Sequence, residues 1–296
     1  MKQTLTIWMM MALVLLAAGG HAQGSITVIT SSDPDALVGN ILGSGITVVP
    51  GSASYVGAPI ASGFFSNGVA SGIGIESGIL LTSGDATLAQ GANTSDDSTG
   101  DNGLPGDPDL DAIAGSTTND ASVLAFKFSS PGGNLFFNYV FASEEYNEYT
   151  NSEFNDAFGF FLDGKNIALI PGTTTPVAIN NVNGGNPFGE NASHPELFHN
   201  NDLSDGGPFF DFAYDGFTNV FTAQALDLAE GTHLIKLAIA DTSDFELDSA
   251  VFIQGGTFSG VPTPPTNNNV IPAPGALVLG LLGAGLVNWL HRRRTV

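Results

Sequence analysis

Two stretches in the middle of the chain decide its fold: Ser122-Val-Leu-Ala-Phe-Lys-Phe128 and Asn134-Leu-Phe-Phe-Asn-Tyr-Val-Phe141. In the first, large apolar side chains recur at every second position, at Leu124, Phe126 and Phe128, and the second continues this alternation as Leu-x-Phe-x-Tyr-x-Phe. Successive side chains of a β-strand point to opposite faces, so each stretch gathers its large apolar residues on one face. Both stretches are therefore predicted to be strands that bury one face.

Short runs of this kind continue through most of the chain. They are rich in β-branched and aromatic residues and are separated by turn-forming residues, among them many of the 38 Gly and 16 Pro. The runs lie at 25–30, 45–49, 78–82, 122–128, 134–141, 157–162, 166–170, 177–181, 217–225, 233–240 and 249–255. Such a series predicts an all-β fold, a jelly-roll-like β-sandwich in a single domain. One short helix is expected at 33–41, with Asp35 as its cap.

Both ends of the chain are hydrophobic, for different reasons. The N-terminus combines Lys2, an apolar stretch and small residues before Gln23, which is the pattern of a secretory signal peptide. Near the C-terminus, an apolar run at about 275–290 is just long enough for a transmembrane helix, and an arginine cluster follows it. These signals predict a signal peptide (1–22), a β-sandwich domain (23–260), a Pro/Asn linker (261–270) and a sorting tail (271–296).

The charge of the predicted exported part is strongly negative. All 29 acidic residues lie in it, together with only three of the seven basic residues, Lys127, Lys165 and Lys236. Such a surface disfavours nucleic acid and anionic membranes as partners and favours divalent cations. The chain has no cysteine, so no disulfide holds the exported fold, and calcium bound by carboxylates is a plausible substitute.

Several motifs resemble one bacterial surface-protein family, the choice-of-anchor L domain, over residues 33–259. They include Phe141-Ala-Ser-Glu-Glu-Tyr-Asn-Glu-Tyr149, Phe154-Asn-Asp-Ala-Phe-Gly-Phe-Phe161 and Ile239-Ala-Asp-Thr-Ser-Asp244. The resemblance implies a protein of the cell surface or extracellular matrix without an established catalytic activity.

The tail resembles a PEP-CTERM sorting signal, with Pro-Ala-Pro in place of Pro-Glu-Pro. This resemblance implies an exosortase-type processing enzyme as a partner, and attachment to the membrane through the C-terminal helix before processing. The expected location is then the cell surface or the extracellular matrix of a Gram-negative bacterium. The residues of the predicted sorting signal are Pro272, Pro274, Arg292, Arg293 and Arg294.

Carboxylate and amide side chains crowd into two predicted connections between strands. Oxygen ligands in flexible loops suit calcium, which takes six to eight of them. If both connections meet at one end of the sandwich, they can share an ion; the alternative is that these side chains cap turns. The candidate metal ligands are Glu144, Glu145, Glu148, Asn155, Asp156, Asp241, Asp244 and Asp248.

The sequence 93–114 is predicted to be a long acidic loop. Within it, Asp107-x-Asp109-x-Asp111 imitates the start of an EF-hand loop, but Ala112 stands where that loop needs Gly and Thr118 where it needs Glu. A solvated acidic loop is the better interpretation of this motif than a metal site.

No arrangement of residues predicts catalysis. The sequence lacks a Cys nucleophile, a Gly-x-Ser-x-Gly elbow and a His-Glu-x-x-His motif, so no catalytic residue is assigned and the protein is not expected to be an enzyme. Aromatic residues beside acids are weak candidates for a sugar-binding face, although packing inside the domain explains most of them as well: Tyr146, Tyr149, Phe209 and Phe210.

Taken together, these features predict an exported, non-catalytic binding or adhesion module that calcium stabilises. Its expected partner is an extracellular polysaccharide, as in a biofilm matrix, or another surface protein. Two alternatives remain: a hydrolase acting on extracellular polysaccharide and a purely structural matrix protein.

Overall fold

The computed structural model of the chain describes residues 24–264. These residues form a mostly β domain with one twelve-stranded sheet, in which the named strands pair antiparallel. The predicted signal peptide, the transmembrane helix and the sorting motif lie outside the described residues. Within residues 24–264, no helix has both the length and the apolar character needed to cross a membrane.

Twelve strands and five short helices follow one another along the described residues. The strands and helices are β1 (Thr27–Thr30), α2 (Pro34–Ile41), β2 (Thr47–Val48), β3 (Ser54–Val56), β4 (Ser62–Ser66), α3 (Gly68–Ser71), β5 (Gly78–Thr82), η1 (Ala86–Ala89), α4 (Pro108–Ala114), β6 (Thr118–Ser143), β7 (Ala157–Leu162), β8 (Lys165–Asn166), η2 (Pro195–Leu197), β9 (Phe198–Asn200), β10 (Gly216–Thr218), β11 (Phe221–Thr242) and β12 (Ser249–Gln254). The main path across the sheet is β1-β4-β5-β12-β6-β11-β7-β8.

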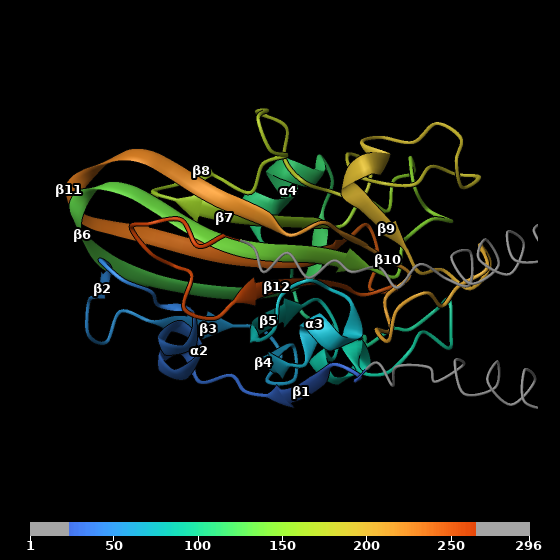
Figure 1. Ribbon diagram of the computed structural model, residues 1–296, viewed down its shortest axis with the longest axis horizontal. Coiled ribbons are helices and arrows are strands. Elements are labelled where there is room, and N and C mark those ends of the chain that lie inside the picture. Colours follow the sequence, from blue (N-terminus) through green and yellow to red (C-terminus); the bar gives the residue numbers. More distant parts are fainter. Residues whose placement is uncertain (1–23, 265–296) are drawn as a thin grey trace, which may run out of the picture.

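Two long strands, β6 and β11, organise the domain. They pair with each other almost from end to end, from Thr118 opposite Thr242 to Tyr139 opposite Phe221. The runs predicted as separate strands at 122–128 and 134–141 are therefore two halves of β6. The predicted run at 217–225 is divided between β10 and the start of β11, and β11 continues through the run at 233–240. Figure 1 shows both strands turning back together at the end where their labels stand. The paired strands β6 and β11 thus contribute to two layers.

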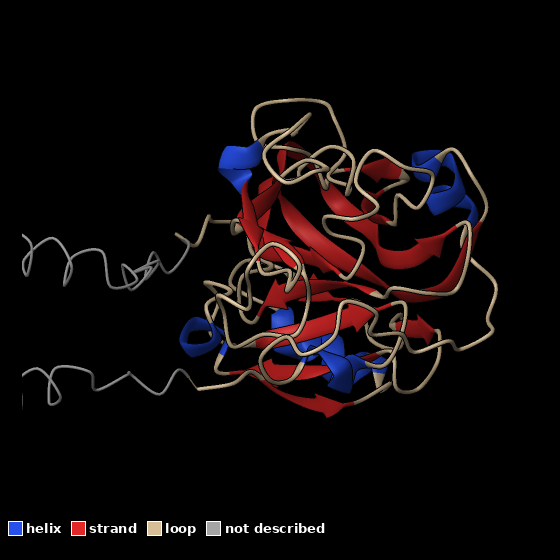
Figure 2. Ribbon diagram, turned by 90° about the vertical axis from the view of Figure 1, so that its right-hand side faces the viewer, coloured by secondary structure: helices blue, strands red, loops and turns tan. Residues whose placement is uncertain are grey.

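The pairing partners define the two layers. One layer contains β1, β4, β5, β12 and the C-terminal half of β6, and the other contains β3, the N-terminal half of β6, β7 and β8. β11 begins in the first layer and ends in the second. The all-β, sandwich-like prediction is confirmed, whereas jelly-roll connectivity is not confirmed by this strand order. Figure 2 shows the strands in an upper and a lower group, with loops around them.

The main hydrophobic core lies between these layers. The residues of β6 that face this core alternate as predicted, with even numbers in the first half and odd numbers after the bend. In the second half the other face is buried as well, because Val140 and Ala142 pack in a second cluster. Phe258, after β12, fills the centre, with its ring centroid 5.2 Å from that of Phe126 and 5.3 Å from that of Phe137. One aromatic ring therefore contacts both halves of the same strand.

Two smaller clusters cover the outer faces of the layers. Phe212, Tyr214 and Phe252 belong to the cluster on the first layer, and Leu110 of α4 packs with Phe161 on the second. The short helix α2 confirms the prediction at 33–41 in position, but its cap is Asp33 rather than Asp35. The Asp33 carboxylate accepts hydrogen bonds from the N–H groups of Asp35 and Ala36.

A histidine on β11 makes the stability of the fold depend on pH. His233 Nδ1 lies 2.7 Å from Asp163 Oδ2, and its Nε2 lies 3.0 Å from the Ala229 carbonyl oxygen. The Asp163 hydrogen bond is the main cause that raises the pKa of His233. Burial acts to raise the pKa of Asp163, but hydrogen bonds from His233 and the Leu234 N–H outweigh it and lower that pKa.

We therefore expect His233→Gln to lower stability most between about pH 4 and about pH 6.5, the unperturbed pKa values of Asp and His. The His233 contribution is full below its unfolded pKa and is lost as pH rises through its raised folded pKa. The Asp163 contribution is present above its unfolded pKa and is lost as pH falls through its folded pKa. The expected loss is below about 1 kcal/mol because Asp163 is half exposed. Urea unfolding from pH 4 to pH 9 measures it, and an equal loss at all pH values would contradict the ion pair.

Candidate functional site

Acidic residues gather where four neighbouring strands begin or end. Glu144 and Glu145 directly follow β6, Asp241 is the penultimate residue of β11, and Asp156 and Asp248 directly precede β7 and β12. Because β12, β6, β11 and β7 are consecutive across the sheet, these residues share one end of the domain. We call these five residues the inner carboxylates. They lie at the end of the domain near β9 and β10 in Figure 1.

Hydrogen bonds show that the two layers meet at this end. Asp156, beside β7, accepts from the Thr242 N–H at 2.8 Å and from the Ser249 hydroxyl at 2.7 Å. Thr242 belongs to the second layer and Ser249 to the first. The Glu144 N–H donates to the Asp248 carbonyl at 3.1 Å, which ties the connections after β6 and before β12 together. The two predicted connections are therefore neighbours in space.

Most inner carboxylates are deeply buried and only partly hydrogen-bonded. Glu144, Glu145, Asp241 and Asp248 are each at most 2% exposed. No donor among the described residues forms a hydrogen bond with either oxygen of Glu145 or of Asp241, and one oxygen each of Glu144 and Asp248 also has none. The Ser83 hydroxyl, close to Asp241, donates to the Ser249 carbonyl instead. Leaving such groups unpaired costs several kcal/mol for an ionised carboxylate, so the arrangement calls for a counter-charge.

The same burial raises the pKa values of these groups. Burial, followed by the charges of Asp156, Asp244 and Glu148, raises the pKa of Glu145 to about 10. Burial raises the pKa of Asp248 to about 7, although the N–H groups of Gly100 and Asp85 act against the shift. Burial also raises the pKa of Asp241, with the charges of Asp156 and Asp248 adding to it. Without a cation, Glu145 is therefore protonated at neutral pH and Asp248 partly so, and a bound cation would take the place of these protons.

The cationic side chains among residues 24–264 do not supply the missing charge. In the described part, the ion pairs are those of His233 with Asp163 and of Lys236 with Asp107 and Asp109. None of these pairs involves an inner carboxylate. Gly84 and Gly100 lie against Asp248, where a Cβ on Gly84 would collide with the Asp248 carboxylate. The loop backbone thus closes over the cluster without neutralising it.

The remaining predicted ligands have other surroundings. Asn155 Oδ1 accepts from the Asn180 N–H at 2.8 Å, which is the turn-stabilising role that the sequence left open. Asp244 Oδ1 accepts from the Glu246 N–H at 3.3 Å and lies at the rim, half-buried. Glu148 is exposed and lies with Asp96 and Asp202 rather than among the inner carboxylates. The predicted set therefore divides into a buried group and rim groups.

Three acidic residues near this end were not predicted as ligands. Asp202 and Asp215 are at most 1% exposed, and Asp96 is exposed in the loop that the sequence marked only as acidic. Burial, together with the charges of Asp202, Asp96 and Glu148, raises the pKa of Asp215 to about 9 although Asn93 donates a hydrogen bond to it. The signal for Asp202 and Asp215 was weak, because single acids in a Gly/Asn-rich segment are also typical of ordinary turns.

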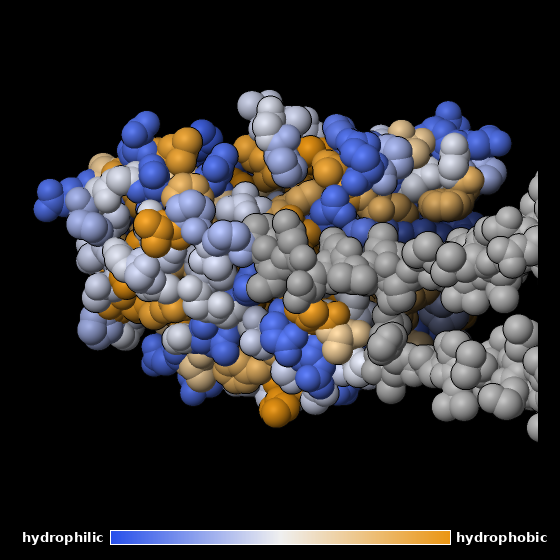
Figure 3. Space-filling model, viewed as in Figure 1, coloured by the Kyte–Doolittle hydropathy of each residue, from blue (hydrophilic) through white to orange (hydrophobic). Residues whose placement is uncertain are grey.

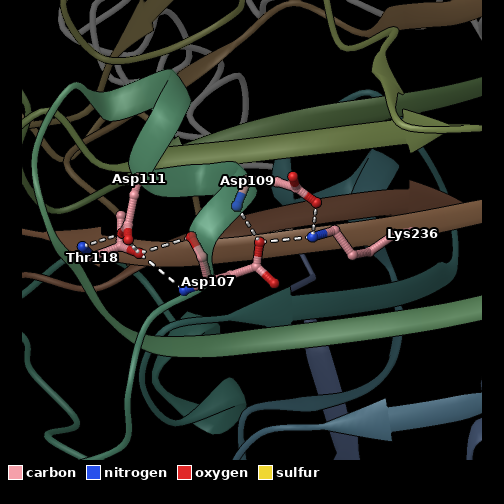
Figure 4. Close-up of polar contacts among 5 residues, drawn as sticks. All are labelled: Asp107, Asp109, Asp111, Thr118 and Lys236. Atoms are coloured by element: carbon pink, nitrogen blue, oxygen red, sulfur yellow. Dashed lines mark hydrogen bonds and ion pairs between the residues drawn. The ribbon is translucent and has the colours of Figure 1, made fainter.

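The acidic motif at 107–111 has a structural role (Figure 4). The prediction of a loop over 93–114 is wrong for its last part, because Pro108–Ala114 forms the helix α4 with Asp107 as its N-cap. Lys236 Nζ lies 2.7 Å from Asp107 Oδ1 and also pairs with Asp109. Asp111 Oδ1 accepts from the Thr118 N–H and from its hydroxyl, each at 2.7 Å. Helix capping and an ion pair thus occupy Asp107, an ion pair occupies Asp109, and hydrogen bonds from Thr118 occupy Asp111.

The aromatic residues considered for sugar binding fall into two groups. Tyr146 is wholly buried and its hydroxyl donates to the Val182 carbonyl, so its place in a surface face is a wrong prediction. Phe210 is half-buried against Phe217, with ring centroids 4.8 Å apart. Tyr149 and Phe209 are 39% and 52% exposed. In the view of Figure 3, hydrophobic side chains lie in separate groups among hydrophilic ones.

Two surface cavities lie apart from the inner carboxylates. One, of about 360 Å³, is lined by residues that include Val56, Leu104 and Val123. The other, of about 350 Å³, lies against the bend of β6 and includes Pro131. Neither is lined by an inner carboxylate, so the carboxylates with raised pKa values do not face these cavities.

Fold and site together define a single all-β domain that encloses an acidic cluster between the ends of its strands. The chain belongs to the choice-of-anchor L domain family, which matches residues 25–259. The match covers most of the chain and nearly all described residues, and it indicates a surface-associated, non-catalytic module. No curated protein and no solved structure is significantly similar to the chain.

Proposed function

We propose that the chain is an exported, surface-displayed or matrix-released binding module whose acidic end is stabilised by calcium. The observation that carries the calcium part is the set of buried carboxylate oxygens without hydrogen-bond partners at Glu145 and Asp241. Calcium accepts six to eight oxygen ligands in variable geometry, which suits carboxylates contributed by separate strand ends. Its charge would also offset the repulsion among these groups.

The residues would have different tasks. Glu145, Asp241, Asp248 and Glu144 have free oxygens and would hold the ion, whereas both oxygens of Asp156 already accept hydrogen bonds. Asp156 would orient the site by joining the two layers beside it. A bound ion would connect the strand ends of both layers, which a chain without disulfides otherwise holds only by hydrogen bonds and packing.

Family membership supports surface display, and the predicted tail suggests how display is achieved. An exosortase-type enzyme would process the tail near Pro272 and Pro274 after export. The displayed domain would then bind exopolysaccharide or a neighbouring surface protein, with Tyr149 and Phe209 as exposed rings available for stacking. A hydrolase would instead release new reducing ends from such a polysaccharide, and a purely structural matrix protein would bind none of the polymers tested.

Thermal unfolding of the chain in calcium, in magnesium and in chelator tests the calcium part. A ligand that binds only the folded state stabilises it by about 2.7 kcal/mol at 100 times its Kd. For a domain of this size we expect a rise in Tm of roughly 5–10 °C in calcium. Magnesium should have a smaller effect because it requires a smaller, near-octahedral site. A Tm that is identical in calcium and in chelator would exclude calcium as the counter-charge.

A further inference from the structure

A second group of carboxylates lies outside the inner carboxylates. Asp96, Glu148 and Asp202 each place a carboxylate oxygen within 4.8 Å of the other two. They come from three segments far apart in sequence: the loop between η1 and α4, the turn after β6, and the segment after β9. We call them the outer carboxylates. Three like charges at this separation repel one another unless a cation joins them.

The hydrogen bonds around the outer carboxylates do not neutralise them. The Ser204 hydroxyl lies 3.1 Å from Glu148 Oε1 and 3.2 Å from Asp202 Oδ2, but it has a single proton to donate. The Ser204 N–H donates to Asp202 Oδ1 at 2.6 Å, and the Leu203 N–H donates to Asp96. These donors fix the positions of the carboxylates and leave their charge unbalanced, since none of them is cationic.

Two buried oxygens beside this group lack hydrogen-bond partners among the described residues: Asp215 Oδ2 and Asn147 Oδ1. Asp215 is fully buried, and its other carboxylate oxygen accepts from the Asn93 side chain. The charges of Asp202, Asp96 and Glu148 all act to raise the pKa of Asp215, so Asp215 is a neighbour of all three outer carboxylates. Asn147 is 3% exposed, and its N–H donates to Asp202 Oδ2 at 3.4 Å. A buried amide oxygen and a buried carboxylate oxygen are both typical calcium ligands.

We propose that Asp96, Glu148 and Asp202 form a second divalent-cation site, of the hard, oxygen-only kind that takes calcium, with Asp215 and Asn147 completing it from the buried side. This site goes beyond the proposed function, which requires only the inner carboxylates. Its ion fastens the acidic loop around Asp96 and the loop around Asp202 onto the turn after β6. Because Asp96 and Glu148 are exposed, the ion keeps open positions that face the solvent.

Counting bound calcium by equilibrium dialysis tests the second site. The whole chain, kept soluble in nonionic detergent, is dialysed against calcium up to about 5 mM, above the range of roughly 10⁻⁴–10⁻³ M typical of extracellular calcium modules. The test variant combines Asp96→Asn with Glu148→Gln; both side chains are exposed, so the fold should tolerate the change. The matched control is Asp97→Asn, an exposed acid next to Asp96 but outside the group. A third variant, Asp241→Asn, removes an inner ligand.

We expect two ions per chain in the wild type and in Asp97→Asn, and one in the double variant. One ion in the wild type that is kept in the double variant and lost in Asp241→Asn would overturn the second site and leave the proposed function intact. Two ions in both the wild type and the double variant would overturn the assignment of these residues. No bound ion in the wild type would overturn both sites.

Discussion

Replacing Asp241 by asparagine is expected to raise the free energy of unfolding in chelator and to remove most of its increase on adding calcium. Neither oxygen of Asp241 accepts a hydrogen bond among the described residues, and its charge is fully buried beside Asp156 and Asp248. In chelator, the substitution removes the cost of burying this carboxyl group, whose pKa is raised, and should stabilise the fold by about 1–3 kcal/mol. In calcium at 100 times Kd, the wild type gains about 2.7 kcal/mol from the ion and the variant should not, so the difference between the two proteins shrinks or reverses.

Urea unfolding of wild type and Asp241→Asn in both buffers measures the two effects. Asp156→Asn is the control, because the Asp156 oxygens accept hydrogen bonds from Thr242 and Ser249. An amide directs an N–H₂ group toward one of these donors, so this variant should lose stability in both buffers. If Asp241→Asn also lost the same free energy in both buffers, its carboxylate would have a structural role and would not be a calcium ligand.

Replacing Phe258 by alanine is expected to cost about 3–5 kcal/mol, the range for truncating a fully buried phenylalanine. The Phe258 ring is 0% exposed and lies 5.2 Å from the ring of Phe128 and 5.3 Å from that of Phe137, measured between centroids. These two rings belong to opposite halves of β6. The substitution leaves a cavity at the point where both halves share a core, and the neighbouring strands are too rigid to close it fully.

The loss in Phe258→Ala should be the same in calcium and in chelator, because Phe258 belongs to the core and not to the acidic end. Phe258→Leu, which keeps most of the apolar volume, should lose less. Phe209→Ala, at a ring that is 52% exposed, should change stability by no more than about 0.5 kcal/mol. A loss below about 1 kcal/mol in Phe258→Ala would show that the two halves of β6 do not depend on this ring.

The sequence determined those properties that depend on local pattern. Alternation at 122–128 and 134–141 identified the residues of β6 that face the main core, because the period of two belongs to each strand separately. It did not show that Phe136, Asn138 and Val140 on the opposite face are buried too. Acids at Glu144, Glu145, Asp156 and Asp248 lie directly beside strands in the sequence, so their place at strand ends was predictable. The motifs around them also pointed to the family that the match over residues 25–259 establishes.

The division of roles among the acids was decided by the tertiary structure. Asp156 is satisfied by Thr242 and Ser249, which lie 86 and 93 residues away in the sequence, whereas Asp241 finds no donor at all among the described residues. Glu148 lies only three residues after Glu145 but joins Asp96 and Asp202 instead. Residue type and spacing in the sequence do not show which distant donors and charges lie beside a given acidic residue.

The pairing across the bend of β6 also could not be predicted from the sequence alone. Residues 129–133 contain Pro131, Gly132 and Gly133, and the sequence alone indicates a turn that separates two strands. In the structure, pairing with β11 continues across this segment, with a register shift between Ala225 and Leu228. Local sequence thus set which side chains of β6 face the main core, because alternation is a property of one strand. Which strand pairs with which, and which carboxylates remain without a partner, depends on contacts between distant segments that form only in the folded chain.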